Sequence, residues 1–363
     1  MTTDKIIAVV GATDQQGGAV ARTFAKLPGW TVRGLTRNVN SHAAKALTKS
    51  GIHPIAADLD DVESLKQAFT GASAVFGVTD FWGFKDRPST AALITEKGIA
   101  WPEAFYLQEV QQGKNIVDAA AAQFAKEGAG LERLVLSTMS NVKRSSGGKY
   151  DSVWHFDSKA RFVQYLAEKA KEEEDGRADS ALGYDSTYSQ LIGRTSYVQM
   201  GYYLDNHKLN PLATPRKNDD GRYTFNVISN PDLKTDPKPI PFVHPTTDLG
   251  PFVEALVLNA SPRTILLGTS EQMLFEDYIK LWAKTLGVTR THINKLTTAD
   301  LVQMLGKEMG EEMGQMLCYA EEFGWTGDEG VSCVLPKDIG VDVDALTTVK
   351  KYIREEDWSA VGL

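Results

Sequence analysis

Short apolar runs alternate with amphipathic segments over the first half of the chain. An apolar run of about four to eight residues is typical of a buried strand, and apolar residues that recur every three or four positions are typical of a helix. We expect strands at 6–10, 30–35, 52–57, 72–79, 131–137 and 195–199, and helices at 19–27, 41–50, 62–69, 103–125 and 157–171. Because strands alternate with helices, the sequence predicts an α/β fold with a doubly wound parallel sheet and helices on both faces.

The rest of the chain predicts a smaller α/β lobe. We expect residues 80–102 to be irregular, and the charged run 169–175 with the polar stretch up to Ser189 to form an exposed insertion. Residues 205–241 are expected to form loops and short hairpins. The helices expected in the last part of the chain are 247–258, 275–286, 297–323 and 344–358. The methionines Met304, Met309, Met313 and Met316 are expected to pack in a core. We expect a sheet domain at 1–205, with contributions from about 242–270, and a substrate-binding or partner-binding lobe at 206–363.

The segment 6–18, IIAVVGATDQQGG, joins a predicted strand to a predicted helix through a glycine-rich turn. The N–H groups and the dipole of a helix N-terminus favour an anion, so this arrangement predicts a phosphate site. Gly11 and Gly17 take the first and third positions of the dinucleotide-binding pattern. Asp14 takes the middle position, where its carboxylate has to face solvent or cap the helix to leave room for a pyrophosphate. The predicted cofactor contacts of this loop also include Thr13, Gln15 and Gln16.

Arg37 follows the second predicted strand, where an NAD-specific site usually carries a carboxylate for the ribose 2′-hydroxyl. A guanidinium pairs well with a 2′-phosphate, so the sequence favours NADP(H) as the cofactor. Ligands of an open α/β sheet bind at the carboxyl ends of its strands. We therefore also place these strand-end residues near the cofactor: Thr36, Asn38, Asp58, Leu59, Thr79, Asp80 and Ser137.

His155 and Lys159 are four residues apart, so they share one face of a helix or its start. Lys159 is predicted to bind the nicotinamide ribose and polarise the site, and His155 to act as a general acid or base near neutral pH. The same segment also fits an ordinary helix start that is capped by Asp157 or Ser158. Capping and catalysis are compatible with each other.

Aromatic residues follow two of the strands and predict a substrate pocket between the sheet and the lobe. The predicted pocket residues are Phe81, Trp82, Met139, Tyr197 and Tyr203, and Tyr202 is a second candidate for the proton donor. Mostly apolar walls with a few hydroxyl groups suit a planar or hydrophobic small molecule. The alternative is that these aromatic side chains only pack the two parts of the chain together.

Composition and charge narrow the class of protein. The chain has 363 residues, of which 42% are hydrophobic, and a net charge of −8. Such a chain can bury a large core, and its negative charge argues against nucleic-acid or membrane binding. Cys318 and Cys333 are expected to be reduced structural thiols, and no metal site is expected. Because the sequence has no signal-peptide core and no apolar run of about 18 residues, we expect a cytoplasmic protein. We expect it to be a monomer or a homodimer.

Six segments together resemble the NmrA-like family, an atypical branch of the short-chain dehydrogenase/reductase superfamily. They are GATDQQGGAVAR at 11–22, VRGLTRN at 32–38, VTDFW at 78–82, HFDSKARFVQYL at 155–166, GYYLDN at 201–206 and TTDLGPFVEAL at 246–256. The resemblance implies a Rossmann domain with a smaller C-terminal lobe, and NADP binding through Gly11, Thr13, Gln16, Gly17, Arg37 and Lys159. Asp14 departs from the glycine that is usual in the family, and His155 stands where short-chain reductases place their catalytic tyrosine.

The resemblance implies one of three functions. The leading hypothesis is an NADP(H)-dependent oxidoreductase, or a related biosynthetic enzyme, that acts on a carbonyl, imine or activated alkene of a hydrophobic small molecule. The second is an NADP(H)-sensing regulator without turnover, which would bind a protein partner and could be nuclear. The third is a biosynthetic enzyme that holds NADP(H) but carries out non-redox chemistry such as cyclisation.

Overall fold

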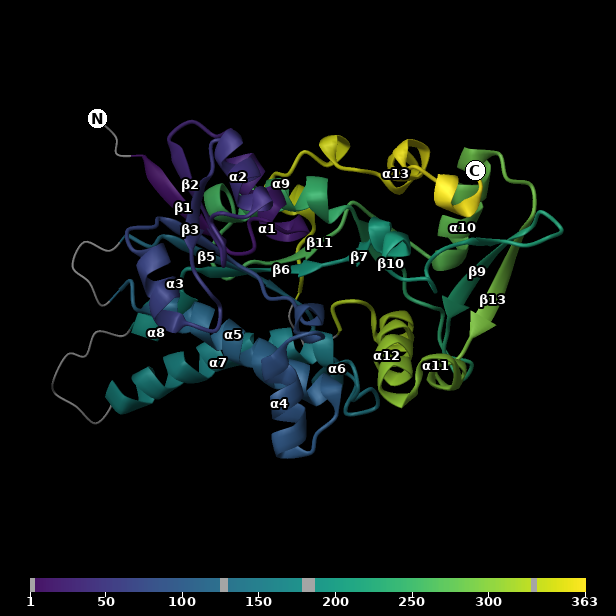
Figure 1. Ribbon diagram of the computed structural model, residues 1–363, viewed down its shortest axis with the longest axis horizontal. Helices are drawn as coiled ribbons and strands as arrows, with labels where there is room; N and C mark the ends of the chain where they lie inside the picture. The colour runs from purple at the N-terminus through teal and green to yellow at the C-terminus, as the bar shows by residue number, and fades with distance from the viewer. Residues whose placement is uncertain (1–3, 125–129, 178–186, 328–331) are drawn as a thin grey trace.

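The computed structural model describes residues 4–124, 130–177, 187–327 and 332–363. One part of the molecule is built on a seven-stranded sheet in the order β3-β2-β1-β4-β5-β6-β11, in which all neighbours are parallel (Figure 1). Its strands are β1 (Lys5–Val9), β2 (Trp30–Thr36), β3 (His53–Ala56), β4 (Ala74–Gly77), β5 (Arg133–Thr138), β6 (Thr195–Met200) and β11 (Ile265–Gly268). The strand order reverses its direction between β1 and β4, as it does in a Rossmann sheet. The predicted α/β Rossmann fold is therefore confirmed.

Helices cover both faces of this sheet. One face carries α1 (Gln15–Phe24), α2 (His42–Lys49) and α9 (Pro245–Leu258), and the other carries α3 (Val62–Phe69), α5 (Trp101–Ala121), α7 (Trp154–Arg177) and α8 (Thr187–Ile192). Ile7 and Val9 of β1 pack in the core under α1 and α9, whereas Ala8 and the following Val10 pack in the core under α3 and α5, because successive residues of a strand point to opposite faces. Each fully buried large apolar side chain contributes about 1.5–3 kcal/mol to folding.

The rest of the chain forms a smaller lobe with two three-stranded sheets, β7-β10-β12 and β8-β9-β13. The elements of the lobe are β7 (Tyr202–Tyr203), β8 (Arg216–Lys217), β9 (Tyr223–Ile228), β10 (Ile240–Val243), β12 (Glu271–Met273), α10 (Phe275–Leu286), β13 (Thr291–Leu296), α11 (Thr298–Leu305), α12 (Lys307–Phe323) and α13 (Val349–Glu355). Trp282 and Tyr319 are fully buried in its core. The predicted helix 297–323 is divided into α11 and α12 at Gly306, which has a φ of 84°.

Three expectations about local structure are wrong. Residues 80–102 contain a short 3₁₀-helix, η1 (Trp82–Phe84), and the helix α4 (Pro88–Lys97). Only Thr90 of α4 is buried, so this helix has no apolar stripe from which it could be predicted. The charged run 169–175 continues α7 as far as Arg177, residues 178–186 of the expected insertion lie outside the described residues, and its last residues, up to Ser189, belong to α8 (Thr187–Ile192). The first helix begins at Gln15, directly after the glycine-rich turn.

The chain returns to the first sheet after it has entered the lobe. The strand β11 pairs with β6 at the edge of the large sheet, and α9 packs against α1. Both elements fall in the range 242–270, whereas β7 begins at Tyr202 and pairs with β10 of the lobe. The proposed division into 1–205 and 206–363 remains a prediction.

None of the helices in the described ranges is long and apolar enough to cross a bilayer. Cys318 is buried in α12 with its Sγ 3.7 Å from the Thr298 hydroxyl, and burial raises the pKa of its thiol. Cys318 and Cys333 do not form a disulfide with each other.

Candidate functional site

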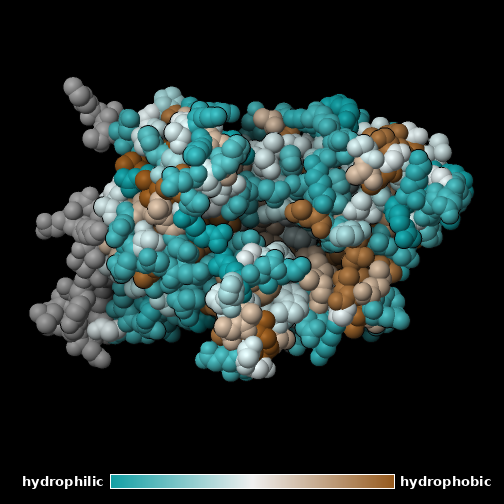
Figure 2. All heavy atoms as spheres, in the orientation of Figure 1, coloured by the Kyte–Doolittle hydropathy of each residue, from teal (hydrophilic) through white to brown (hydrophobic). Residues whose placement is uncertain are grey.

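A cavity of about 1470 Å³ opens at the carboxyl ends of the parallel strands and continues into the lobe. Figure 2 shows a hollow near the middle of the surface, bordered in part by hydrophobic residues. The predicted cofactor residues line the cavity, namely Gly11, Thr13, Asp14, Gln15, Gln16, Gly17, Thr36, Arg37, Asn38, Asp58, Leu59, Thr79, Asp80, Ser137 and Lys159. Of the predicted catalytic and substrate residues, Phe81, Trp82, Met139, His155, Tyr202 and Tyr203 also line it. Their roles remain predictions.

The glycine-rich turn has the geometry that its residues predict. Gly11 has a φ of 64°, a conformation that favours glycine. A Cβ atom added to Gly17 would lie 2.3 Å from the carbonyl oxygens of both Val10 and Gly11. The first turn of α1 therefore packs directly against the end of β1, and its free N–H groups are available to an anion.

Asp14 has an exposed side chain at the N-cap position of α1, but the side chain makes no capping hydrogen bond. Desolvation and the nearby Asp80 carboxylate raise the pKa of Asp14, and the charge of Arg37 lowers it in part. The Arg37 side chain is exposed and forms no salt bridge within the described ranges. The guanidinium is thus available to an anionic ligand at the mouth of the cavity.

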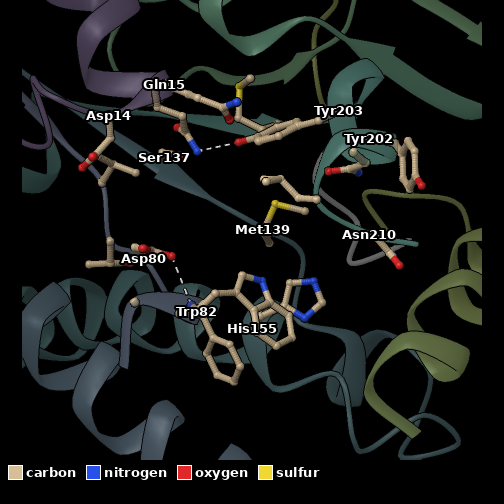
Figure 3. Close-up of a pocket in the computed structure, with 18 of the residues that line it drawn as sticks. Asp14, Gln15, Asp80, Trp82, Ser137, Met139, His155, Tyr202, Tyr203 and Asn210 are labelled. Atoms are coloured by element: carbon tan, nitrogen blue, oxygen red, sulfur yellow. Dashed lines mark hydrogen bonds between the residues drawn. The ribbon is translucent and has the colours of Figure 1, made fainter. Parts of the chain in front are cut away.

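Two glutamines join the first turn of α1 to the lobe. The Gln16 amide donates a hydrogen bond of 2.7 Å to the Tyr203 hydroxyl (Figure 3), and the Gln15 amide donates one of 2.7 Å to the Asp205 carboxylate. The Gln16 Oε1 atom is buried and has no hydrogen-bond partner among the described residues. Because an unpartnered buried acceptor is costly, this oxygen marks a place where a ligand donor fits.

Lys159 lies in α7 beside a carboxylate that the sequence analysis did not predict. Its Nζ donates a hydrogen bond of 2.6 Å to Glu109 Oε1, and the Thr79 hydroxyl donates one of 2.7 Å to the same oxygen. The Ser158 hydroxyl donates to the second oxygen, Oε2. The Glu109 side chain is fully buried, and that of Lys159 is 12% exposed. The ammonium group is therefore held in one position at the wall of the cavity.

His155 is held in a similar way by a carboxylate of the lobe. Glu312 of α12, whose side chain is fully buried, accepts hydrogen bonds from His155 Nδ1 and from the backbone N–H groups of Trp154 and His155. The carboxylate thus caps the N-terminus of α7, so the cap is Glu312 and not the predicted Asp157 or Ser158, which lie within the helix. The His155 ring lies 5.6 Å from that of Trp82 at the cavity (Figure 3), and Nε2 is the ring nitrogen left for a ligand.

Tyr202 lies farther toward the lobe than the other candidates. Its ring packs edge-on against those of Phe242, Phe275 and Trp325. Burial raises the pKa of Tyr202 to about 12, although a hydrogen bond with Asn206 opposes the shift. A phenol with so high a pKa is a weak proton donor near neutral pH.

Two expectations about the pocket are wrong. Tyr197 does not line the cavity, because it is buried in the core between the sheet and the helices α5 and α7. Met309, Met313 and Met316 do line the cavity rather than only filling a core, while Met304 is 55% exposed on α11. The three cavity methionines are three or four residues apart, so they share one face of α12.

Glu109 and Glu312 were missed by the sequence analysis, although each left a signal. Glu109 lies on the buried stripe of α5 that includes Phe105 and Ile116, and Glu312 lies on the buried stripe of α12 with Met316. A charged residue on an apolar stripe is rare unless it is paired. Its partner comes from a distant segment, so the pairing itself was not visible in the sequence.

Known proteins share both the sequence pattern and the fold. A family model described as the NmrA-like family matches residues 3–353. The "NmrA-like family domain-containing oxidoreductase hkm9" of Aspergillus hancockii is 46% identical over 296 residues, which are 78% of this chain and 73% of that protein.

Two solved structures are similar in fold. NmrA, described as a negative transcriptional regulator in complex with NADP, has a TM-score of 0.63 and 19% identity, with 99% of this chain and 98% of that chain covered. An NADPH-dependent quinone oxidoreductase of Escherichia coli, complexed with NADPH, has a TM-score of 0.60 and 16% identity over 96% and 98% of the two chains. The family match extends through the lobe, beyond the six segments that suggested it. The chain belongs to the NmrA-like family.

Proposed function

We propose that this protein is an NADP(H)-dependent oxidoreductase that reduces a carbonyl, an imine or an activated alkene in a hydrophobic small molecule. The observation that supports the proposal is one continuous cavity with a glycine-rich helix start at one end, Lys159 and His155 at its wall, and apolar side chains at the other end. The relative from Aspergillus hancockii is named an oxidoreductase, which agrees with this proposal.

The residues at the nucleotide end fit NADP(H). Gly17 lets the first turn of α1 pack directly against the end of β1, Gln16 has an unpartnered buried oxygen, and Arg37 offers a guanidinium to a 2′-phosphate. When bound, NADPH supplies a hydride to the substrate. The remaining strand-end residues, Thr36, Asn38, Asp58, Leu59, Thr79, Asp80 and Ser137, would border the nucleotide along the edge of the sheet.

Lys159 would orient the nicotinamide ribose and polarise the site. Glu109 fixes the position of its ammonium group, so little side-chain entropy is lost when a ligand accepts a hydrogen bond from it. His155 would donate the proton that completes a reduction. Its Nδ1 is held by Glu312, which leaves Nε2 as the ring nitrogen from which the protonated ring would give its proton to the substrate. Tyr202 is the poorer donor because of its raised pKa.

The second candidate function is an NADP(H)-sensing regulator. The observation in its favour is the fold similarity to NmrA, described as a negative transcriptional regulator. The two glutamine contacts between α1 and the lobe offer a route by which nucleotide binding could alter a partner surface. In that case the cavity would hold NADP(H) without turnover.

The test is single-turnover oxidation of NADPH, followed by its absorbance, with the protein in excess over NADPH. The panel of acceptors contains neutral ketones, quinones and imines with apolar bodies. We expect oxidation with at least one of them, and a slower rate in the His155→Asn variant at unchanged NADPH affinity. Tight NADPH binding without oxidation by any acceptor would exclude the reductase. Product formation without a change in NADPH would instead support a non-redox enzyme.

A further inference from the structure

The lobe end of the cavity differs in kind from the end at the glycine-rich turn. We name it the methionine chamber, and its walls include Phe225 of β9, Ile279 of α10, Met309, Met313 and Met316 of α12, and Trp325. Five of the eight methionines in the chain line the cavity, namely these three, Met139 and Met200. Methionine side chains are flexible and polarizable, so such a wall adapts to irregular apolar surfaces.

The ionisable groups that line the cavity are concentrated away from the chamber. Asp14, Arg37, Asp58 and Asp80 belong to the glycine-rich turn and the strand ends. Three more are held by carboxylate partners: Arg87 by Asp60 at 3.1 Å, Lys159 by Glu109 and His155 by Glu312. Within the described ranges, none of these groups offers an unpaired charge in the chamber that could neutralise a charge on the body of a substrate.

His207 is a further ionisable group in the wall of the cavity. Its ring stacks on Trp358 with 4.5 Å between centroids, and its Nε2 lies 3.0 Å from the Tyr352 hydroxyl. Burial lowers the pKa of His207. The neutral imidazole therefore predominates at pH 7.

The chamber also has a small polar component. Tyr278 of α10 lines it, and no hydrogen bond to the Tyr278 hydroxyl is found within the described part of the chain. The Asn206, Asn210 and Asn226 side chains line the cavity as well, and Asn210 is drawn on the lobe side of the cavity in Figure 3. A substrate can thus make one or two neutral hydrogen bonds at the end that is remote from Lys159.

We infer that the substrate is a neutral, elongated, mostly apolar molecule, with its reactive group at His155 and Lys159 and an uncharged body in the methionine chamber. The inference rests on the proposed function, because it takes the chamber to hold a substrate of the same enzyme. A carboxylate, sulfonate or phosphate on the body would lose its hydration without gaining a partner, which costs several kcal/mol. Such molecules are therefore excluded from the chamber.

The test uses two fluorescent dyes, the neutral Nile red and the anionic 1-anilinonaphthalene-8-sulfonate, titrated in the presence of saturating NADP⁺. Nile red is expected to bind with one site and at least about ten-fold more tightly than the sulfonate dye. Met313→Asp should weaken Nile red binding by about ten-fold or more, because it introduces an unpaired charge into the chamber. Met313→Leu, which keeps the wall apolar, should retain binding within about two-fold.

The matched control is Met304→Asp, since Met304 is exposed on α11 and does not line the cavity. It should leave Nile red binding unchanged. Met309→Asp repeats the test on the same wall, and NADP⁺ affinity reports whether each variant is folded. Equal affinity for the two dyes, or unchanged Nile red binding in both Met313→Asp and Met309→Asp, would overturn the inference.

The dye measurement tests the neutral chamber and the turnover measurement tests the reductase, so one proposal can be overturned while the other stands. If Nile red binds in the chamber but no acceptor oxidises NADPH, the neutral chamber stands and the reductase does not. If an acceptor with an anionic body, assayed beside the neutral panel, oxidises NADPH, the reductase stands and the neutral substrate does not.

Discussion

The two ends of the cavity are built in different ways. The nucleotide end is organised around one local segment, the glycine-rich turn at 11–17, and residues at the ends of the neighbouring parallel strands β2, β3, β4 and β5 add to it. The methionine chamber is made of side chains from β9, α10, α12 and Trp325, which are separated by up to about a hundred residues of chain. The comparison teaches that a nucleotide site can be recognised from one local pattern, whereas a substrate site depends on how distant helices pack.

The largest effect is expected from Gly17→Ala. The new Cβ atom would lie 2.3 Å from two backbone carbonyl oxygens, so the first turn of α1 has to move away from β1. We expect NADPH affinity to fall by at least about a hundred-fold, or about 3 kcal/mol, when it is measured by calorimetry. Nile red binding should change much less, because the chamber does not depend on this turn.

Gly18→Ala is the matched control. Its Cβ atom would meet mainly the Arg22 Nη1 atom, at 2.9 Å, and that flexible side chain can move. NADPH affinity should stay within about three-fold of the unaltered protein. If Gly17→Ala lost the dye as well as the nucleotide while remaining folded, the two ends would not be independent.

The second effect is expected from Glu312→Gln, which acts at the lobe. The amide cannot accept all three hydrogen bonds that the carboxylate accepts, so the free energy of unfolding should fall by about 2 kcal/mol. In ¹⁵N-histidine NMR spectra, the Nδ1-protonated form of His155 should give way to a mixture of tautomers. The chain has six histidines, and the His155→Asn spectrum assigns the signal.

Glu308→Gln, an exposed position in the first turn of the same helix, is the control for a change of charge in α12. It should change the free energy of unfolding by no more than about 0.5 kcal/mol. The His155 signal should stay the same. A His155 tautomer that is the same in Glu312→Gln and in the unaltered protein would show that Glu312 only caps α7.

The third effect concerns the nucleotide end alone. Arg37→Asp removes the guanidinium and places a third carboxylate near Asp14 and Asp80. We expect the affinity for NADP⁺ to fall by roughly 1–3 kcal/mol and that for NAD⁺ to fall less, when both are measured by calorimetry. Equal losses for the two nucleotides would mean that Arg37 does not recognise the 2′-phosphate.

The smallest effect is expected on α7 itself, away from both ends. Burial raises the pKa of Asp157 to about 7 from an ordinary 3.8. The native state therefore holds a proton that the unfolded state releases, and stability falls as the pH rises through about 4 to 7. Asp157→Asn should remove this fall and be more stable at pH 8 by about 1 kcal/mol, measured by urea unfolding at pH 5 and pH 8. The exposed Asp151→Asn should leave the pH dependence unchanged.

Much of the first sheet could be predicted because its signals are local. Buried strands such as β4 are continuous apolar runs, and α3 has the predicted bounds of 62–69. The glycine-rich turn was recognised because Gly11 has a positive φ and Gly17 packs against backbone atoms, and glycine suits both positions better than any other residue. The strand-end residues followed from the topology of a parallel sheet.

The rest depends on contacts between distant residues. α4 was missed because it buries only Thr90, and Tyr197 was assigned to the pocket because the face of β6 to which it points was not known. The buried partners of Lys159 and His155 are about 50 and 157 residues away in the chain. A stripe of methionines looks the same in the sequence whether it packs in a core or lines a cavity.

The return of the chain to the first sheet has a consequence for how this protein can be divided. A fragment that ended at residue 205 would lack β11, and the edge of β6 would then present unpaired N–H and C=O groups. It would also lack α9, so that the buried face of α1, including Phe24, would be open to water. Gene fusions, truncations or lobe exchanges between relatives therefore have to carry the segment 242–270 together with the N-terminal half.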